Sequence, residues 1–212
     1  SEQSKLAIKK IAEIDVELSR AYDQKLKNSD GCINILLTGS FEGLPKKLFN
    51  AIADVINESI IEKSFKNKLL SFYKEHLKEP SSDDVIELLQ RLQKSIVDSK
   101  FQIQGISITI DELGKHVEYA GSNQKDGDIY VLQKLAEYSV SESEVPIFFN
   151  VMLHQGIEFY AKELDSETKA EWRKIQGRFE EISFIEGPEQ SMRVIAKALK
   201  HDLKQSQVAK VK

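Results

Sequence analysis

The chain has 212 residues, 41% of them hydrophobic and 30% charged, which is the balance of an ordinary soluble protein. Its formal net charge of -4 excludes a broad electropositive surface that grips a nucleic-acid backbone. Cys32 is the only cysteine, which excludes an intramolecular disulfide and a multi-cysteine zinc site. No apolar run reaches the roughly 18 to 20 residues of a membrane span. We therefore expect a cytoplasmic protein without membrane contact.

The first half of the chain is expected to contain a helix, a strand and a helical layer. Apolar residues at mostly helical spacing predict one surface helix over Leu6–Leu26. The β-branched run Cys32–Thr38, which ends at Gly39, predicts a buried strand. Pro80–Asp84 offers both a stop and a helix cap within a helical layer at 44–97. The helices of this layer are predicted at Leu44–Ile61, Phe65–Leu77 and Val85–Val97.

The second half alternates between strands and helices. Strands are predicted at Gly105–Asp111, Val145–Leu153 and, as a short piece, Glu181–Ile185. Helices are predicted at Ile129–Tyr138 and Pro188–Leu203. Because long helical connections separate the strands, we predict an α/β fold with a parallel sheet, right-handed crossovers and helices on both faces.

Two adjacent carboxylates, Asp111 and Glu112, follow the second predicted strand directly. The carboxyl ends of parallel strands are where ligands of open α/β sheets collect. One interpretation is that the pair only caps a helix that begins near Leu113. The other is that Ile106–Glu112 resembles a Walker B motif, in which Asp111 holds magnesium through its water shell and Glu112 orients or deprotonates the attacking water.

A wider resemblance supports the second interpretation. It rests on the segments Asp111–Tyr119, Asp128–Glu137, Leu153–Gln155 and Glu171–Phe179. Their succession resembles the ATPase core of large bacterial AAA+/STAND-like P-loop ATPases, some of which are associated with phage defence. The resemblance spans roughly Ile33 to Leu199. It implies a P-loop NTPase-like α/β domain over residues 1–199 that uses Mg²⁺ and ATP, followed by a polar basic tail or linker at 200–212.

The same resemblance implies roles for residues after the acidic pair. Asn150, His154 and Gln155 are candidates for the γ-phosphate sensor, and Arg178 for an arginine finger that acts on a neighbouring subunit. The alternatives are a half-buried structural role for His154 and a surface ion pair between Arg178 and the glutamates that follow it. The nearby aromatic residues are predicted to be core: Phe148, Phe149, Phe159, Tyr160 and Trp172.

The chain departs from this family at the phosphate-binding loop. No stretch fits G-x-x-x-x-G-K-[ST], and Gly39–Lys47 has Leu44 and Pro45 where that motif needs glycine and lysine. Proline also removes a backbone donor from a loop that binds phosphate through N–H groups. We therefore interpret Cys32–Gly39 as the second strand of the core, which would place the first strand and the Walker A loop upstream of Ser1. The chain is then either a fragment or truncated product of such a core, or a degenerate relative of it.

Three functional hypotheses follow. The first is part of a P-loop ATPase core that supplies Walker B, sensor and finger elements, binds nucleotide weakly or not at all alone, and works with a protein partner or by self-association. The second is a catalytically inert α/β interaction module, whose helical layer at 44–97 docks a partner. The third is a complete small enzyme that uses Glu112 and His154 on a different substrate.

Overall fold

The computed structural model describes residues 2–27, 29–123, 129–155, 159, 166–182 and 187–198. The chain divides into two units, residues 1–179 and 180–212. The elements of the larger unit are α1 (Glu2–Ala12), α2 (Val16–Lys27), β1 (Gly31–Thr38), α3 (Leu44–Glu58), α4 (Lys63–His76), α5 (Ser82–Val97), β2 (Ile103–Asp111), α6 (Gly114–Ser122), α7 (Tyr130–Ser139), β3 (Ile147–Val151) and α9 (Ser166–Gln176), and the smaller unit holds α10 (Pro188–Ala198).

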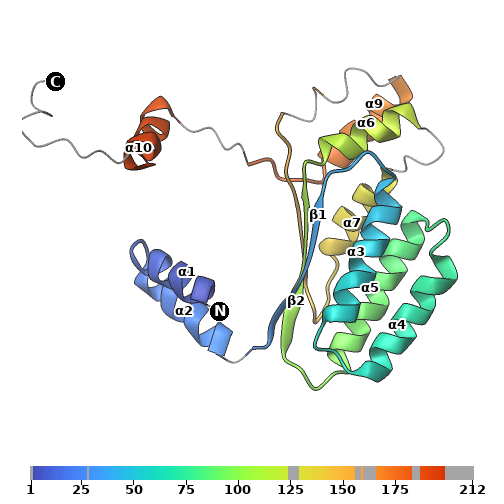
Figure 1. Ribbon diagram of the computed structural model, residues 1–212, viewed down its shortest axis with the longest axis horizontal. Helices are drawn as coiled ribbons and strands as arrows, with labels where there is room; N and C mark the ends of the chain where they lie inside the picture. Colours follow the sequence, from blue (N-terminus) through green and yellow to red (C-terminus); the bar gives the residue numbers. More distant parts are fainter. Residues whose placement is uncertain are drawn as a thin grey trace, which may run out of the picture. The chain divides into compact units, whose positions relative to one another are not determined.

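The described strands form one parallel sheet in the order β1-β2-β3 (Figure 1). Helices α3, α4 and α5 connect β1 to β2, and α6 and α7 lie between β2 and β3 in the chain. The prediction that these strands pair in parallel within one sheet is confirmed. The expected strand Glu181–Ile185 falls mostly on residues 183–186, which lie outside the described part of the chain.

The sheet is covered on one face only within the described residues. Helices α3, α5 and α7 lie on that face (Figure 1), where Ile35 and Ile108 are fully buried. The alternate residues of each strand are exposed or half-buried in the described part of the chain, so the expectation of helices on both faces stays a prediction. We call this second side the open face; its residues are Asn34, Leu36, Ser107, Thr109, Phe148 and Asn150.

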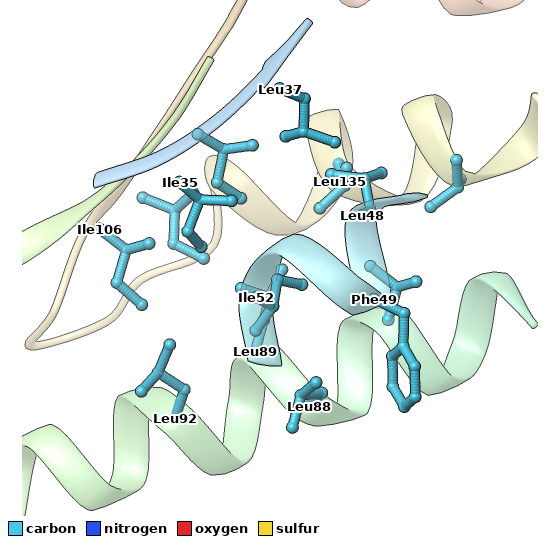
Figure 2. Packing of buried hydrophobic residues seen from close by; sticks show 14 of the residues in the cluster. Ile35, Leu37, Leu48, Phe49, Ile52, Leu88, Leu89, Leu92, Ile106 and Leu135 are labelled. Atoms are coloured by element: carbon cyan, nitrogen blue, oxygen red, sulfur yellow. The ribbon is translucent and has the colours of Figure 1, made fainter. Parts of the chain in front are cut away.

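The hydrophobic core lies between the covered face and the helical layer (Figure 2). Leu48 and Ile52 of α3 and Leu89 of α5 are fully buried, and they face Ile35 and neighbouring residues of the strands. Removal of this much apolar surface from water is the main favourable contribution to folding. The predicted helical layer at 44–97 is confirmed, with helix ends that differ from the prediction by up to three residues.

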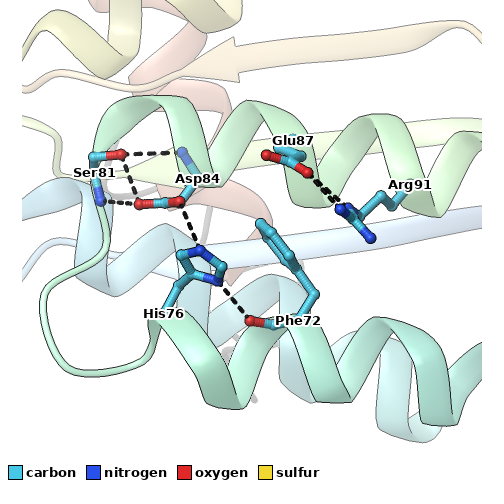
Figure 3. Close-up of polar contacts among 6 residues, drawn as sticks. All are labelled: Phe72, His76, Ser81, Asp84, Glu87 and Arg91. Atoms are coloured by element: carbon cyan, nitrogen blue, oxygen red, sulfur yellow. Dashed lines mark hydrogen bonds and ion pairs between the residues drawn. The ribbon is translucent and has the colours of Figure 1, made fainter.

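The junction between α4 and α5 is fixed by a capping box (Figure 3). The Asp84 N–H donates to Ser81 Oγ at 3.2 Å, and the Ser81 N–H donates to Asp84 Oδ2 at 2.7 Å. His76 lies 3.7 Å from Asp84 Oδ1 through Nε2 and 3.0 Å from the Phe72 carbonyl through Nδ1. The predicted stop and cap at Pro80–Asp84 are therefore confirmed.

The amino-terminal helix was predicted as one piece but forms two. The break at residues 13–15 separates α1 from α2, because Asp15 Oδ1 accepts the Leu18 N–H at 2.9 Å and so caps α2. The Ser19 hydroxyl of α2 donates to the Ile8 carbonyl of α1 at 3.0 Å, and the two helices pack on each other. A capping aspartate without glycine or proline nearby did not disrupt the periodicity on which the prediction relied.

The predicted aromatic core is confirmed only in part. Trp172 is buried, and Phe149 packs against the core. Phe148 is 59% exposed and Phe159 is also exposed, so the prediction is wrong for both, whereas Tyr160 lies outside the described residues. Trp172 belongs to α9, a helix that was not predicted. Among the described residues, no helix combines the length and apolar character needed to cross a membrane.

Candidate functional site

The candidate site lies at the carboxyl edge of the sheet, where β1, β2 and β3 end. Asp111 ends β2 and pairs in register with Thr38 at the end of β1. The backbone of Met152, just after β3, bonds to Ile110 and Leu113 at 2.8 and 3.1 Å and so brings the end of β3 alongside. This arrangement places His154 Nε2 3.3 Å from Glu112 Oε1. The ends of β2 and β3 therefore share one edge, as the parallel pairing of these strands requires.

Glu112 has a left-handed backbone conformation with φ 53°, and it is the only non-glycine residue with positive φ in the described part of the chain. Such a conformation is unfavourable for a residue with a Cβ, and it persists only where surrounding contacts impose it. The Glu112 N–H donates to Asp111 Oδ1 at 2.8 Å, and its carbonyl accepts the Lys115 N–H at 3.2 Å. These two hydrogen bonds hold the backbone of the turn on both sides of Glu112.

Gly39 provides the space for this turn. A Cβ on Gly39 would lie 2.1 Å from the Glu112 carbonyl oxygen, well inside any real contact. The Gly39 N–H also donates to the Asp111 carbonyl at 2.8 Å. The end of β1 and the end of β2 are thus packed backbone to backbone, which only glycine at position 39 permits.

Both oxygens of the Glu112 carboxylate have cationic or imidazole partners. Lys115 Nζ donates to Oε2, and His154 Nε2 lies against Oε1. The Lys115 hydrogen bond, followed by that of His154, lowers the pKa of Glu112, and Glu112 in turn raises the pKa of Lys115. All three side chains are solvent-accessible, so solvent screens these pairs and they orient Glu112 more than they stabilise the fold.

The acidic pair does not cap α6. The residue before that helix is Leu113, and no side chain makes a cap hydrogen bond there. The Glu112 carboxylate instead contacts Lys115 and His154, and Asp111 Oδ1 accepts from the adjacent N–H. The alternative in which the pair is only a helix cap therefore does not describe this turn.

A second polar cluster ties the β1–α3 loop to α6. His116 is 1% exposed, and its Nδ1 donates to the Glu42 carbonyl at 2.8 Å. Burial lowers the pKa of His116, so the ring stays neutral near pH 7. The Glu42 carboxylate accepts from Ser40 Oγ at 2.5 Å and Lys47 Nζ at 3.0 Å, and the Ser40 bond is the first cause of its lowered pKa.

Among the described residues, none of the other predicted site residues hydrogen-bonds to the Glu112 carboxylate. Asn150 is exposed on the open face in register with Thr109, and Gln155 is exposed just past His154. Arg178 Nε donates to Glu137 Oε1 of α7 at 2.7 Å, and its Nη1 donates to the Lys174 carbonyl at 2.6 Å. Its ion-pair partner is therefore not one of the two glutamates that follow it. Its role as a finger stays a prediction.

Sequence reasoning missed three residues of the site. Lys115 stands three positions after Glu112, and this spacing at the start of a helix was the available signal. Gly39 was considered as the end of a strand and the start of a loop, but its close approach to Glu112 depends on strand pairing. His116 had no signal, because its burial results from the loop that covers it.

The edge offers a cation one exposed carboxylate rather than a closed metal site. No group of three or more His, Cys, Asp or Glu side chains that could hold a metal occurs within the described residues. Magnesium is commonly held by one or two carboxylates with water and phosphate oxygens, and Asp111 offers an exposed carboxylate of which one oxygen accepts the Glu112 N–H.

A phosphate cradle is not formed by the β1–α3 loop. Its Gly39 and Glu42 N–H groups bond within the protein, and α3 carries a proline in its first turn.

Comparison of the chain with protein-family models, with curated proteins and with solved structures finds no match. The geometry of the carboxyl edge therefore carries the functional argument.

Proposed function

We propose that this chain supplies the acidic part of a P-loop ATPase core, and that a phosphate-binding loop from outside these residues completes it. The observation that carries the proposal is Glu112, which is held in a left-handed turn at the end of the central strand with its carboxylate between Lys115 and His154. Unfavourable backbone conformations of this kind cluster at functional sites.

Each residue of the edge has a defined task in this proposal. Asp111 would hold Mg²⁺ through its water shell, and Glu112 would orient the attacking water and accept its proton. Bound Mg²⁺ and ATP supply the reacting phosphoryl group and the charge that stabilises its transfer. Lys115 and His154 hold the Glu112 carboxylate in place, and Gly39 keeps the two strand ends in contact.

The sensor and the finger are proposed on the resemblance. His154 is the sensor candidate that contacts the acidic pair, through Glu112. Among the described residues, Asn150 and Gln155 make no hydrogen bond to Asp111 or Glu112. Arg178 would need to leave Glu137 before it could reach a phosphoryl group in a neighbouring subunit. A protein partner or self-association is therefore part of the proposal.

Mn²⁺ provides a direct test, because it shares the preference of Mg²⁺ for oxygen ligands and broadens nearby NMR signals. We expect low concentrations of Mn²⁺, added to the ¹⁵N-labelled 212-residue chain, to broaden the amide signals of residues 38–40, 111–113 and 151–154. Asp111→Asn should abolish this broadening. Asp98→Asn removes an exposed carboxylate at the end of α5 and serves as the matched control.

The result that contradicts the proposal is equally definite. If Mn²⁺ broadens these amides equally in the parent chain and in Asp111→Asn, Asp111 is not the ligand. If the broadened signals belong to other acidic residues, the carboxyl edge is not a cation site. Either outcome would favour the inert interaction module.

A further inference from the structure

The open face of the sheet and helix α2 both expose apolar side chains, and a short stretch of chain keeps these two regions close together. On the open face, Leu36 of β1 is 71% exposed and Phe148 of β3 is also exposed. Met152, which directly follows β3, is exposed as well. On α2, Leu18 and Tyr22 are 50% and 53% exposed. Parallel sheets are seldom left uncovered on one face.

The open face has a shape that suits a helix. Its central strand presents small residues, Ser107 and Thr109, in register with larger neighbours. Leu36 stands beside Thr109 on one side, and Phe148 stands beside Ser107 on the other. Asn34 and Asn150 complete the two outer rows, so the small central residues let a helix approach the strands and contact one apolar side chain in each row.

Helix α2 presents a matching surface. Leu18 and Tyr22 are four residues apart and therefore share one side of the helix. Ser19 is buried against α1 through its bond to the Ile8 carbonyl, so α1 covers a different side. The side that carries Leu18 and Tyr22 is left for another contact.

The tether fixes where α2 can go. Only residues 28–30 separate α2 from β1, and connections of this length are common between a helix and a strand that pack together. Asp30 is anchored to the residue just before β2, since its N–H donates to the Gln102 carbonyl at 2.9 Å and its Oδ2 accepts the Gln102 N–H at 2.7 Å. A tether this short keeps α2 at an effective concentration on the order of millimolar beside the open face.

We propose that the α1–α2 hairpin docks on the open face, with α2 antiparallel to β1 and with Leu18 and Tyr22 against Leu36 and Phe148. Helix α2 fits within the length of β1, because α2 has 12 residues and is about 18 Å long, and β1 has 8 residues and spans about 26 Å. The hairpin is thus the second layer that the one-sided sheet lacks. It goes beyond the proposed ATPase role and does not depend on it.

Cys32 reports this docking without any added label. It is the only cysteine of the chain and is exposed at the start of β1 on the side of the open face. The test measures the rate at which a thiol reagent modifies Cys32 under native conditions. We expect the rate in the parent chain to be at least about tenfold lower than in Leu18→Asp/Tyr22→Asp, because the docked hairpin protects the start of β1.

The control places the same acidic pair on the opposite side of α2. Arg20→Asp/Gln24→Asp keeps the spacing and helix propensity, and we expect it to label at the parent rate. Equal rates in all three proteins would overturn the proposal. Protection that increases with protein concentration would also overturn it, in favour of a second copy of the chain as the occupant.

A measurement on the parent chain needs no substitution. Docking predicts nuclear Overhauser contacts between the Leu18 and Leu36 methyl groups at low protein concentration. Their absence, with both residues assigned, would contradict the proposal even if the acidic variants unfold α2.

Discussion

The covered face of the sheet and its carboxyl edge are built from the same strands but obey different rules. On the covered face, alternate residues such as Ile106 and Ile108 are fully buried against α3, α5 and α7. At the edge, Glu112 has a left-handed backbone and an exposed carboxylate held between Lys115 and His154. Burial of apolar side chains on the covered face stabilises the fold. At the edge, the backbone conformation of Glu112 is unfavourable and costs stability. This difference is what we expect between a scaffold and a site.

The largest effect should come from the covered face. Leu89→Ala removes a fully buried side chain and should lower the free energy of unfolding by about 2 to 5 kcal/mol. Leu36→Ala makes the same chemical change on the open face, where the sheet itself leaves Leu36 71% exposed and only the proposed docking of α2 would cover it, and it should cost clearly less. Urea denaturation of both variants checks this, and equal losses would mean that the two faces are not different environments.

The next effect tests the contact between strand ends. Gly39→Ala places a Cβ against the Glu112 carbonyl, so the turn must shift, at a cost of about 1 to 3 kcal/mol. Gly177→Ala is the control, because its nearest new contacts are at 3.5 Å or beyond. We also expect Gly39→Ala to displace the NMR signals of residues 111–113. Unchanged stability and unchanged signals would show that the contact does not hold the turn.

A smaller effect isolates the backbone of Glu112. Both Glu112→Ala and Glu112→Gly remove the carboxylate, but only glycine accepts φ 53° without a steric penalty. The glycine variant should therefore be more stable than the alanine variant by about 1 kcal/mol. Thermal unfolding measures the difference. An alanine variant as stable as the glycine variant would argue against backbone strain at this position.

The smallest effect concerns pH. Burial lowers the pKa of His116 in the folded protein, whereas a histidine in an unfolded chain has a pKa of about 6.5. As pH falls through that value, the unfolded state takes up a proton that the folded state does not, so stability falls. His116→Asn keeps a donor for the Glu42 carbonyl but does not titrate. Between neutral pH and pH 5 the parent should lose more stability than the variant, and equal losses would contradict this account.

The fold was more predictable than the site, because the sequence patterns that predict each helix or strand lie within that element or directly beside it. The β-branched run before Gly39 and the capping residues Ser81 and Asp84 were read correctly from their own segments. The one-sided sheet could also have been predicted, since Asn34, Ser107 and Asn150 place polar side chains on one side of every strand.

The geometry of the site could be predicted only in outline. That Asp111 and His154 share an edge follows from parallel pairing, which was predicted from the helical connections. The left-handed turn of Glu112 depends on the absence of a side chain at Gly39, on another strand. The burial of His116 depends on a loop 74 positions away in the chain. Such long-range packing leaves no periodic pattern in one sequence.

A phosphate-release assay with Mg²⁺ and ATP on the 212-residue chain tests the central claim, that the acidic edge is present without a phosphate cradle. The assay compares the parent chain with Glu112→Gln and with Glu118→Gln, which changes an exposed carboxylate of α6 and serves as the control. We predict background hydrolysis in all three, because positioning of the triphosphate supplies most of the catalysis. Hydrolysis by the parent at about 1 per second or faster, abolished by Glu112→Gln and retained by Glu118→Gln, would contradict the account.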